Sequence, residues 1–124
     1  MTTTGNIFEL QHGQNFSLIR FFGFIDASTV EKLRPVMARH LPEDCMNLII
    51  DVTRVDFLDS HGVGFFVSLL KRTHRQGGKL CIAGIDGQPA SVLQMVGFNS
   101  TLVTYCKNAE EAERLFKEET RAAG

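Results

Sequence analysis

Tryptophan is absent from this 124-residue sequence and tyrosine occurs once, whereas phenylalanine occurs ten times. Surfaces that stack on sugars or nucleic-acid bases favour tryptophan and tyrosine, so we interpret the phenylalanines as core residues. Neither sign of charge is in excess, because 13 Lys and Arg stand against 14 Asp and Glu, for a net charge of −1. A main partner that is nucleic acid would favour a basic patch. The composition therefore argues against such a partner.

Cysteine is scarce, and no Cys-x-x-Cys pair occurs. Cys45, Cys81 and Cys106 are an odd number and lie far apart in the sequence. This pattern is typical of reduced, mostly buried thiols in a cytosolic protein.

Long apolar runs are also missing. No segment approaches the roughly 20 apolar residues that cross a bilayer. The residues after Met1 lack the basic region and apolar run of a signal peptide. We therefore expect a cytoplasmic protein that makes no direct contact with a membrane.

The overall composition, with 44% hydrophobic and 22% charged residues, is typical of a soluble globular protein. The length suits one domain with a substantial core. We expect a single domain over residues 1–124, with a core from about residue 7 to about residue 118 and flexible ends.

The first half of the chain predicts a strand pair and then a helix. Ile7–Leu10 and Phe16–Phe22 are predicted strands that can form a hairpin around a turn at Gly13 and Asn15. A helix follows, for which Ser28 or Thr29 is the expected cap. Its apolar residues recur at helical spacing, at Val30, Leu33, Val36, Met37 and Leu41.

The second half alternates strands and helices. Leu48–Val52 predicts a buried strand, Thr53–Asp59 a loop, and Ser60–Gln76 a helix that ends at Gly77 and Gly78. The predicted core stripe of this helix is Val63, Phe66, Val67, Leu70 and Thr73. Strands at Lys79–Ala83 and Leu102–Cys106 and helices at Pro89–Val96 and Ala109–Glu119 follow, and the last helix is expected to bury Ala112, Leu115 and Phe116. This order predicts an α/β fold with helices packed on a mostly parallel sheet.

The most informative run surrounds Asp59 and Ser60, where the chain leaves a strand and begins a helix. Gly62 and Gly64 leave the first helical turn without bulk. Free backbone N–H groups and the positive end of the helix dipole lie there, and both favour an oxygen-bearing residue. Ser60 can therefore cap the helix, which is the usual role of a serine here, or carry a phosphate.

Enzymatic sites are not predicted. Asp59, Ser60 and His61 are consecutive, so their side chains point in different directions, and no Gly-x-Ser-x-Gly elbow occurs. The sequence has no phosphate-binding glycine loop. Neither the four histidines nor the aspartates have metal-ligand spacing, so we expect no metal and no cofactor.

Four segments together are similar to a known family. They are Gly23-Phe24-Ile25-Asp26; Leu48-Ile49-Ile50-Asp51 with the following Val55-x-Phe57-x-Asp59-Ser60-x-Gly62-Val63-Gly64; Gly78-Lys79-Leu80; and Val92 to Phe98. Because these segments occur in this order, the chain from about Phe8 to Phe116 resembles the STAS domain in its single-domain form. The proteins of that form are the bacterial anti-sigma factor antagonists. The resemblance implies the STAS fold, with a mostly parallel sheet of about five strands, about four helices and an N-terminal hairpin-like strand pair.

The resemblance also implies a switch rather than an enzyme. In that family the serine after the signature aspartate is phosphorylated by an anti-sigma factor that is a GHKL-type serine kinase, and a PP2C-type serine phosphatase reverses the reaction. The unphosphorylated form binds the anti-sigma factor, and phosphorylation releases it. Carried onto this chain, Ser60 is the phosphorylation site. The implied partner-binding residues are Asp26, Asp59, Ser60, His61, Gly62 and Phe65.

Two positions depart from the family pattern, and one alternative function stays open. His61 stands where many members have serine or threonine, and Phe24 where relatives often have a polar residue. Some STAS domains are instead non-switching subunits of lipid or ABC-type transport complexes. The sequence also leaves open whether Phe57, Phe65 and Leu69 are exposed or belong to a wide core face.

Overall fold

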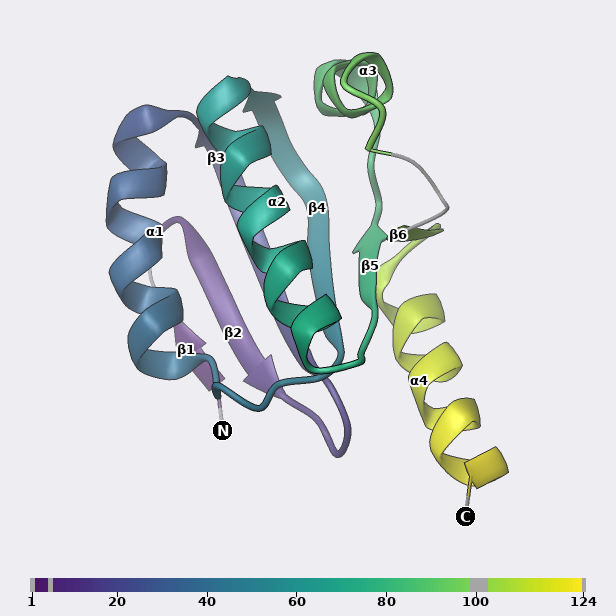
Figure 1. Ribbon diagram of the computed structural model, residues 1–124. Coiled ribbons are helices and arrows are strands. Elements are labelled where there is room, and N and C mark those ends of the chain that lie inside the picture. Colours follow the sequence, from purple (N-terminus) through teal and green to yellow (C-terminus); the bar gives the residue numbers. More distant parts are fainter. Residues whose placement is uncertain (1, 5, 99–102, 124) are drawn as a thin grey trace.

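The computed structural model describes residues 2–4, 6–98 and 103–123, which form one sheet with helices on both faces (Figure 1). The strands are β1 Thr2–Thr4, β2 Phe8–His12, β3 Ser17–Ile25, β4 Leu48–Leu58, β5 Leu80–Ala83 and β6 Val103–Cys106. The helices are α1 Ala27–His40, α2 Ser60–Arg75, α3 Gly87–Met95 and α4 Ala109–Ala123.

The six strands lie in the order in which they occur in the chain. The pairs β1–β2 and β2–β3 are antiparallel, and the three pairs from β3 to β6 are parallel. The predicted α/β fold, with a mostly parallel sheet and an N-terminal hairpin, is confirmed. The short strand β1 is an addition that the sequence pattern did not predict.

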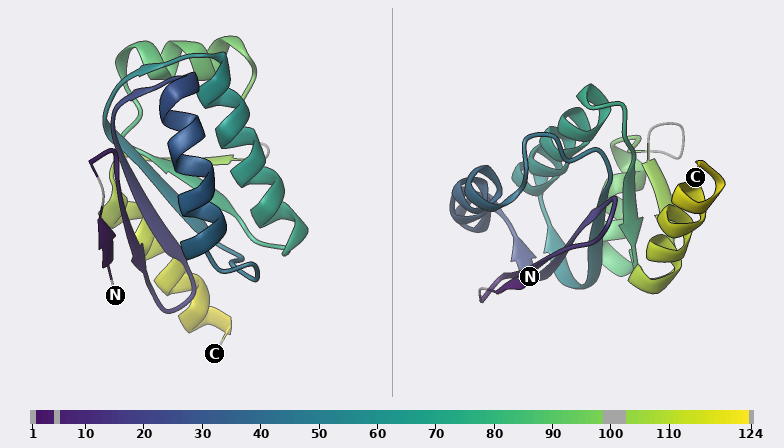
Figure 2. Two further views of the ribbon diagram at one scale, coloured as in Figure 1. Left: turned by 90° about the vertical axis from the view of Figure 1, so that its left-hand side faces the viewer. Right: turned by 90° about the horizontal axis from the view of Figure 1, so that it is seen from below.

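Helices cover both faces of the sheet (Figure 2). The connections β3–α1–β4 and β4–α2–β5 join neighbouring parallel strands, and crossovers of one hand place both helices on the same face. Helix α4 lies on the opposite face, and α3 lies near the carboxyl end of β4. The carboxyl ends of β3 and β4 and the first turns of α1 and α2 therefore meet at one edge of the molecule.

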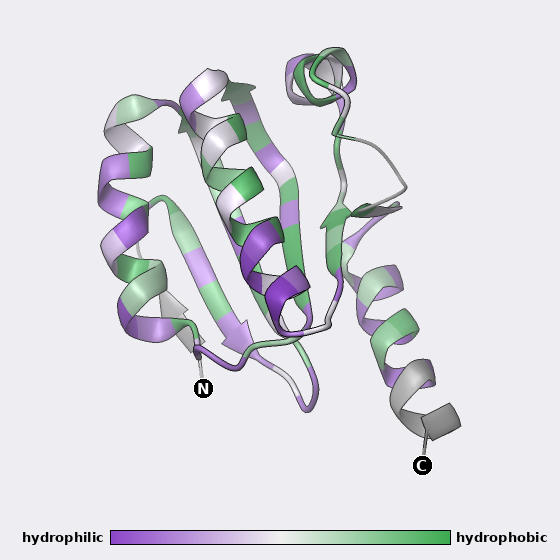
Figure 3. Ribbon diagram, viewed as in Figure 1, coloured by the Kyte–Doolittle hydropathy of each residue, from purple (hydrophilic) through white to green (hydrophobic). Residues whose placement is uncertain are grey.

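Two apolar cores correspond to these two faces. In the larger core, under α1 and α2, the ring of Phe21 packs against the rings of Phe65 and Phe66 with centroids 5.8 and 6.0 Å apart. In the smaller core, under α4, Phe16 stacks on Phe116. Figure 3 shows that the middle of α2 is apolar and its last turns are hydrophilic. Basic residues in that last turn also suit the negative end of the helix dipole.

Helix α1 begins earlier than the sequence predicted, and its cap is Asp26 rather than Ser28 or Thr29. The carboxylate of Asp26 accepts hydrogen bonds from the backbone N–H groups of Ser28 and Thr29, and the Asp26 N–H donates to the Thr29 hydroxyl. This reciprocal pair is a capping box, in which threonine takes the place of the usual glutamate. Pro35 lies inside the helix, which continues to His40.

The expected loop over Thr53–Asp59 is wrong, because β4 continues as a strand to Leu58. Its register with β3 shifts at two places, and at each place β4 has one residue more than β3. These β-bulges make the core-facing residues of the segment recur every third residue, at Val52, Val55 and Leu58. Strict alternation is the sequence signal for a strand, so the bulges concealed this one.

The predicted helix at Ser60–Gln76 is confirmed, with Gln76 as the capping residue and Gly77 in the left-handed conformation at φ 76°.

The predicted core stripes need two corrections. In α2 the most buried face is centred differently, on Gly62, Phe65, Phe66, Leu69 and Thr73. In α4, Leu115 is 40% exposed and does not face inward, whereas Ala112 and Phe116 are buried as predicted. Of the cysteines, Cys81 and Cys106 are buried and Cys45 is half-buried.

Candidate functional site at the carboxyl ends of β3 and β4

Two aspartates lie side by side at this edge of the sheet. Ile25 of β3 and Leu58 of β4 are paired in register, and Asp26 and Asp59 are the residues that follow them. The N–H of Asp59 donates to the carbonyl of Ile25 over 3.4 Å, so the pairing extends to the start of α2. Each aspartate caps the helix that it precedes.

The Asp26 carboxylate is held in place by its cap. The Ser28 hydroxyl donates to Asp26 Oδ1 at 2.8 Å, and the Thr29 N–H donates to it at 3.2 Å. These hydrogen bonds, the Ser28 hydroxyl first, lower the pKa of Asp26 below its ordinary value. The group therefore stays ionised at neutral pH, and the start of α1 carries a fixed negative charge.

Asp59, and not Ser60, caps α2. Its Oδ1 accepts the backbone N–H groups of His61 at 2.9 Å and Gly62 at 3.1 Å. Ser60 is the first residue of the helix and is exposed, and within the described residues its hydroxyl makes no hydrogen bond. The capping role that the sequence allowed for Ser60 is thus wrong. Its hydroxyl is free for a reaction or a contact.

His61 lies on the surface beside the cap. Its side chain is 62% exposed, and Nδ1 is 3.6 Å from Asp59 Oδ2, an ion pair when the imidazole is protonated. No hydrogen bond joins His61 to Ser60 in the part of the chain that the structure describes. A serine nucleophile needs a base within hydrogen-bond reach, so this arrangement is not a nucleophilic triad.

Gly62 is a packing residue. It is buried, and a Cβ atom there would lie 2.6 Å from the Ile25 carbonyl oxygen and collide with the Leu58 side chain. Gly64 is exposed, and a Cβ on it would meet nothing. The absence of a side chain at Gly62 therefore lets the first turn of α2 lie directly on the ends of β3 and β4.

The structure places Phe65 in the core, with 1% of the residue exposed. Its ring packs edge-on against Phe21, and the guanidinium carbon of Arg34 lies 5.7 Å above it. In this conformation Phe65 has almost no surface to offer a partner. It anchors α2 beneath the surface that Ser60 and His61 form.

An exposed aromatic residue lies at the same edge. Phe24 of β3 is 57% exposed, and its ring lies 5.3 Å from the ring of half-buried Phe57 on β4. The two residues are paired in register. Aromatic residues are enriched at protein–protein interfaces relative to the rest of the surface, so Phe24 is a candidate contact for a partner.

The STAS domain matches residues 8–112 of the sequence, which is most of the chain. The chain belongs to the STAS domain family. Among curated proteins, it is 21% identical over 98 residues to the anti-sigma F factor antagonist of Paenibacillus polymyxa, covering 78% of this chain and 84% of that one. It is 27% identical over 88 residues to the anti-sigma-B factor antagonist of Listeria monocytogenes, covering 71% and 75%.

Solved structures of other proteins share the fold. A putative anti-sigma factor antagonist from Thermotoga maritima has a TM-score of 0.77 at 16% identity, covering 86% of this chain and 92% of that one. The phosphorylated form of the Bacillus cell fate determinant SpoIIAA has a TM-score of 0.68 at 22% identity, covering 87% and 98%. At these identities the likeness concerns the fold alone.

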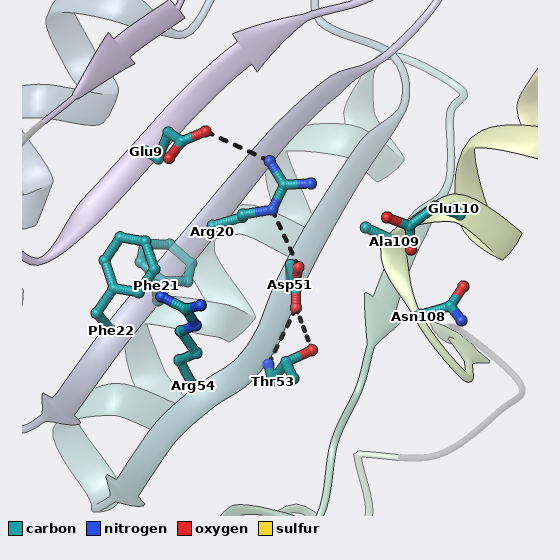
Figure 4. A pocket seen from close by; sticks show the side chains of 10 residues that line it. All are labelled: Glu9, Arg20, Phe21, Phe22, Asp51, Thr53, Arg54, Asn108, Ala109 and Glu110. Carbon is teal, nitrogen blue, oxygen red and sulfur yellow. Dashed lines mark hydrogen bonds and ion pairs between the residues drawn. The ribbon is translucent and has the colours of Figure 1, made fainter.

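This STAS domain also has a cavity of about 440 Å³ on the sheet (Figure 4), and Ser60 is not among the residues that line it. Arg20 lies in its wall, and its guanidinium is bound by Asp51 at 3.2 Å and Glu9 at 3.4 Å. Asp51 in turn accepts hydrogen bonds from the N–H and hydroxyl of Thr53. Arg20, Asp51 and Glu9 thus bind one another, while Arg54 and Glu110 also line the cavity.

Neither a metal-binding cluster nor a membrane-spanning helix is present among the described residues. Over residues 2–4, 6–98 and 103–123, no three His, Cys, Asp or Glu side chains gather in a way that could hold a metal ion. In the same residues, no helix is long and apolar enough to cross a membrane.

Sequence reasoning named Asp26 as a partner-binding residue but missed its capping role, and it missed the roles of two further residues at this edge. It overlooked Asp26 as a cap, although the Asp-x-x-Thr spacing of Asp26 and Thr29 is a usable signal. It left Phe57 unplaced, because the bulges of β4 hide the side to which Phe57 points. It did not single out Gln88 of α3, whose contact with β4 joins residues 30 positions apart and leaves no local signal.

Proposed function

We propose that this protein is a phosphorylation-controlled binding switch. Unphosphorylated, it binds and sequesters an anti-sigma factor that is a GHKL-type serine kinase; phosphorylation of Ser60 releases that partner, and a PP2C-type phosphatase restores binding. The protein acts in the cytoplasm and is not itself an enzyme. The observation that carries the proposal is the free, exposed hydroxyl of Ser60, beside the Asp59 cap.

The relatives support this role. The curated proteins to which the chain is similar are anti-sigma factor antagonists, and a structural neighbour of the same fold is a phosphorylated protein. The chain covers 84% and 75% of the two curated relatives described above. The proposal therefore draws on relatives that this chain covers over most of their length.

The electrostatics explain how a phosphate would weaken binding. It adds about −1.5 to −2 charge at neutral pH, next to the carboxylates of Asp59 and Asp26. The N–H groups of His61 and Gly62, which would otherwise neutralise part of this charge, already donate to Asp59. Because a partner that covers Ser60 must desolvate the added charge, its affinity falls.

The proposed binding surface combines polar and apolar parts. Ser60 and His61 form its exposed centre, with Asp26 and Asp59 half-buried beside them. Phe24 supplies an apolar contact at the same edge. The other two predicted partner-binding residues, Gly62 and Phe65, act from below by fixing the start of α2.

The test uses the cognate anti-sigma factor kinase, ATP and two variants of the site. We expect mass spectrometry to find one phosphate on Ser60, none on Ser60→Ala, and a titration to show that Ser60→Ala binds the kinase as tightly as wild type. Ser60→Asp should bind at least about tenfold more weakly, because its carboxylate imitates part of the phosphate charge. Ser91→Asp is the matched control, since Ser91 is an exposed serine on α3. Phosphate on another residue, or equal affinity of Ser60→Ala and Ser60→Asp, would contradict the proposal.

A further inference from the structure

Among the described residues, no strand pairs with the second half of β4 along its β5-facing edge. Strand β5 pairs only with Leu48–Asp51, whereas β4 continues to Leu58. Strand β3 pairs with β4 along its other edge up to Leu58. A buried backbone N–H or C=O group without a partner is costly, so the end of β4 needs a substitute for the missing strand.

Helix α3 supplies that substitute through one side chain. The Leu58 N–H donates to Gln88 Oε1 at 2.8 Å, and Gln88 Nε2 donates to the Leu58 carbonyl at 2.8 Å. One primary amide thus makes the two hydrogen bonds that a paired strand residue would make. Leu58 has both of its backbone groups satisfied by a residue 30 positions away.

Gln88 is an exposed residue, but the helix that carries it is capped and docked. Asp86 caps α3 and accepts the Gly87 N–H at 2.8 Å, and the φ of 57° at Gly87 turns the chain into the helix. Pro89 and Leu93 bury the inner side of α3. The amide is therefore presented from a docked helix, not from a free loop.

Leu58 connects this contact to the candidate site. Its side chain is fully buried, and the missing side chain of Gly62 leaves room for it under the first turn of α2. The next residue along the chain is Asp59, whose carboxylate caps α2 and leaves the hydroxyl of Ser60 free. A displacement of the Leu58 backbone would move the cap and Ser60 with it.

We propose that Gln88 is a positioning residue of the switch: its amide clamps the Leu58 backbone and so holds Asp59 and Ser60 in the geometry that the partner kinase recognises. The functional part of this inference rests on the proposed function of Ser60. The structural part does not rest on that function. It states that the Gln88 contact couples α3 to the start of α2.

The structural part is tested on the isolated protein by NMR hydrogen exchange. We expect Gln88→Ala to lower the protection of the Leu58 amide by about tenfold, the effect of losing a typical hydrogen bond. The amide of Ile50, in the middle of β4, should keep its protection and so report an intact fold. Gln94→Ala is the matched control, because Gln94 is an exposed glutamine on the same helix. Unchanged protection of Leu58 in Gln88→Ala would overturn the clamp.

Gln88→Glu gives a readout that loss of packing cannot imitate. A carboxylate accepts the Leu58 N–H but repels the Leu58 carbonyl, whereas a protonated carboxyl group both accepts and donates. After correction for intrinsic exchange rates, Leu58 protection in Gln88→Glu should therefore rise toward the wild-type value as pH falls through about 4.3, the ordinary glutamate pKa, or somewhat above. Gln88→Ala should show no such recovery. Identical pH profiles of the two variants would contradict the hydrogen-bonding role.

The functional part is tested with the kinase. If the clamp populates the recognised conformation, its loss reduces the competent fraction, which raises KM while kcat at saturation stays unchanged. We expect KM for Gln88→Ala to rise about three- to tenfold, and KM for Gln94→Ala to match wild type. A wild-type KM in Gln88→Ala, together with lost Leu58 protection, would overturn the positioning role. Absence of phosphorylation in the wild-type protein would instead refute the proposed function and the functional part with it, and the exchange result would still decide the clamp.

Discussion

At the start of α2, the neighbouring residues Asp59 and Ser60 have different roles. Asp59 satisfies the N–H groups of His61 and Gly62, so Ser60 is not needed for helix stability. The sequence already marked Asp59 and Ser60, because an aspartate and a serine follow a buried strand at a predicted helix start. It did not show which of them caps the helix. That choice depends on backbone dihedrals, and Asp59 takes the extended conformation of a cap.

Two glycines in the first turns of α2 provide a matched pair of substitutions. Gly62→Ala should lower the free energy of unfolding by about 1–3 kcal/mol, because the new methyl group meets the Ile25 carbonyl and the Leu58 side chain. Gly64→Ala should raise it by about 0.5–1 kcal/mol, because its Cβ enters open space and alanine favours the helix. Urea unfolding of both variants measures the two effects. Equal shifts in the same direction would contradict the close packing at Gly62.

At the scale of elements, the regular parts of the fold were predictable from the sequence and the irregular parts were not. Helix α2 has apolar residues at helical spacing and a Gly-Gly end, so its bounds were predicted to within one residue. Strand β4 was predicted only as far as Val52, because its two bulges replace alternation by a three-residue repeat. Local pattern also could not show that Gln88 completes β4, since that contact depends on the tertiary position of α3.

Helix α4 covers the second core, and two adjacent residues test its docking. Phe116 is buried and stacks on Phe16 with ring centroids 6.1 Å apart, whereas Leu115 is 40% exposed. Phe116→Ala should lower the free energy of unfolding by about 3–5 kcal/mol through lost burial and a cavity. Leu115→Ala should change it by less than about 1 kcal/mol. Thermal or urea unfolding distinguishes this arrangement from the sequence-based prediction, in which both residues face inward and both substitutions are costly.

At the scale of the whole molecule, the candidate switch residue Ser60 lies apart from the two apolar cores that stabilise the fold. The larger core lies between the sheet and α1 and α2, and the smaller core lies under α4 on the opposite face. Ser60 belongs to neither and lies at the carboxyl edge of the sheet. A charge added there changes the surface that a partner meets, while the contacts that stabilise the domain stay as they are.

Phosphorylation of Ser60 should therefore change binding without refolding the protein. We expect the free energies of unfolding of the phosphorylated and unphosphorylated forms to differ by less than about 1 kcal/mol, as is usual for changes at exposed sites away from the core. Changes in amide exchange should be confined to the starts of α1 and α2, around residues 26–29 and 59–63, and to the Leu58–Gln88 contact coupled to them. Within the described residues, the Ser60 hydroxyl makes no hydrogen bond through which a phosphate could move more distant elements. Denaturant titration and hydrogen-exchange mass spectrometry of the two forms measure both quantities. Altered exchange in β6 or α4 would show that the phosphate acts by a change of fold, and charge in the interface would then not be the cause of release.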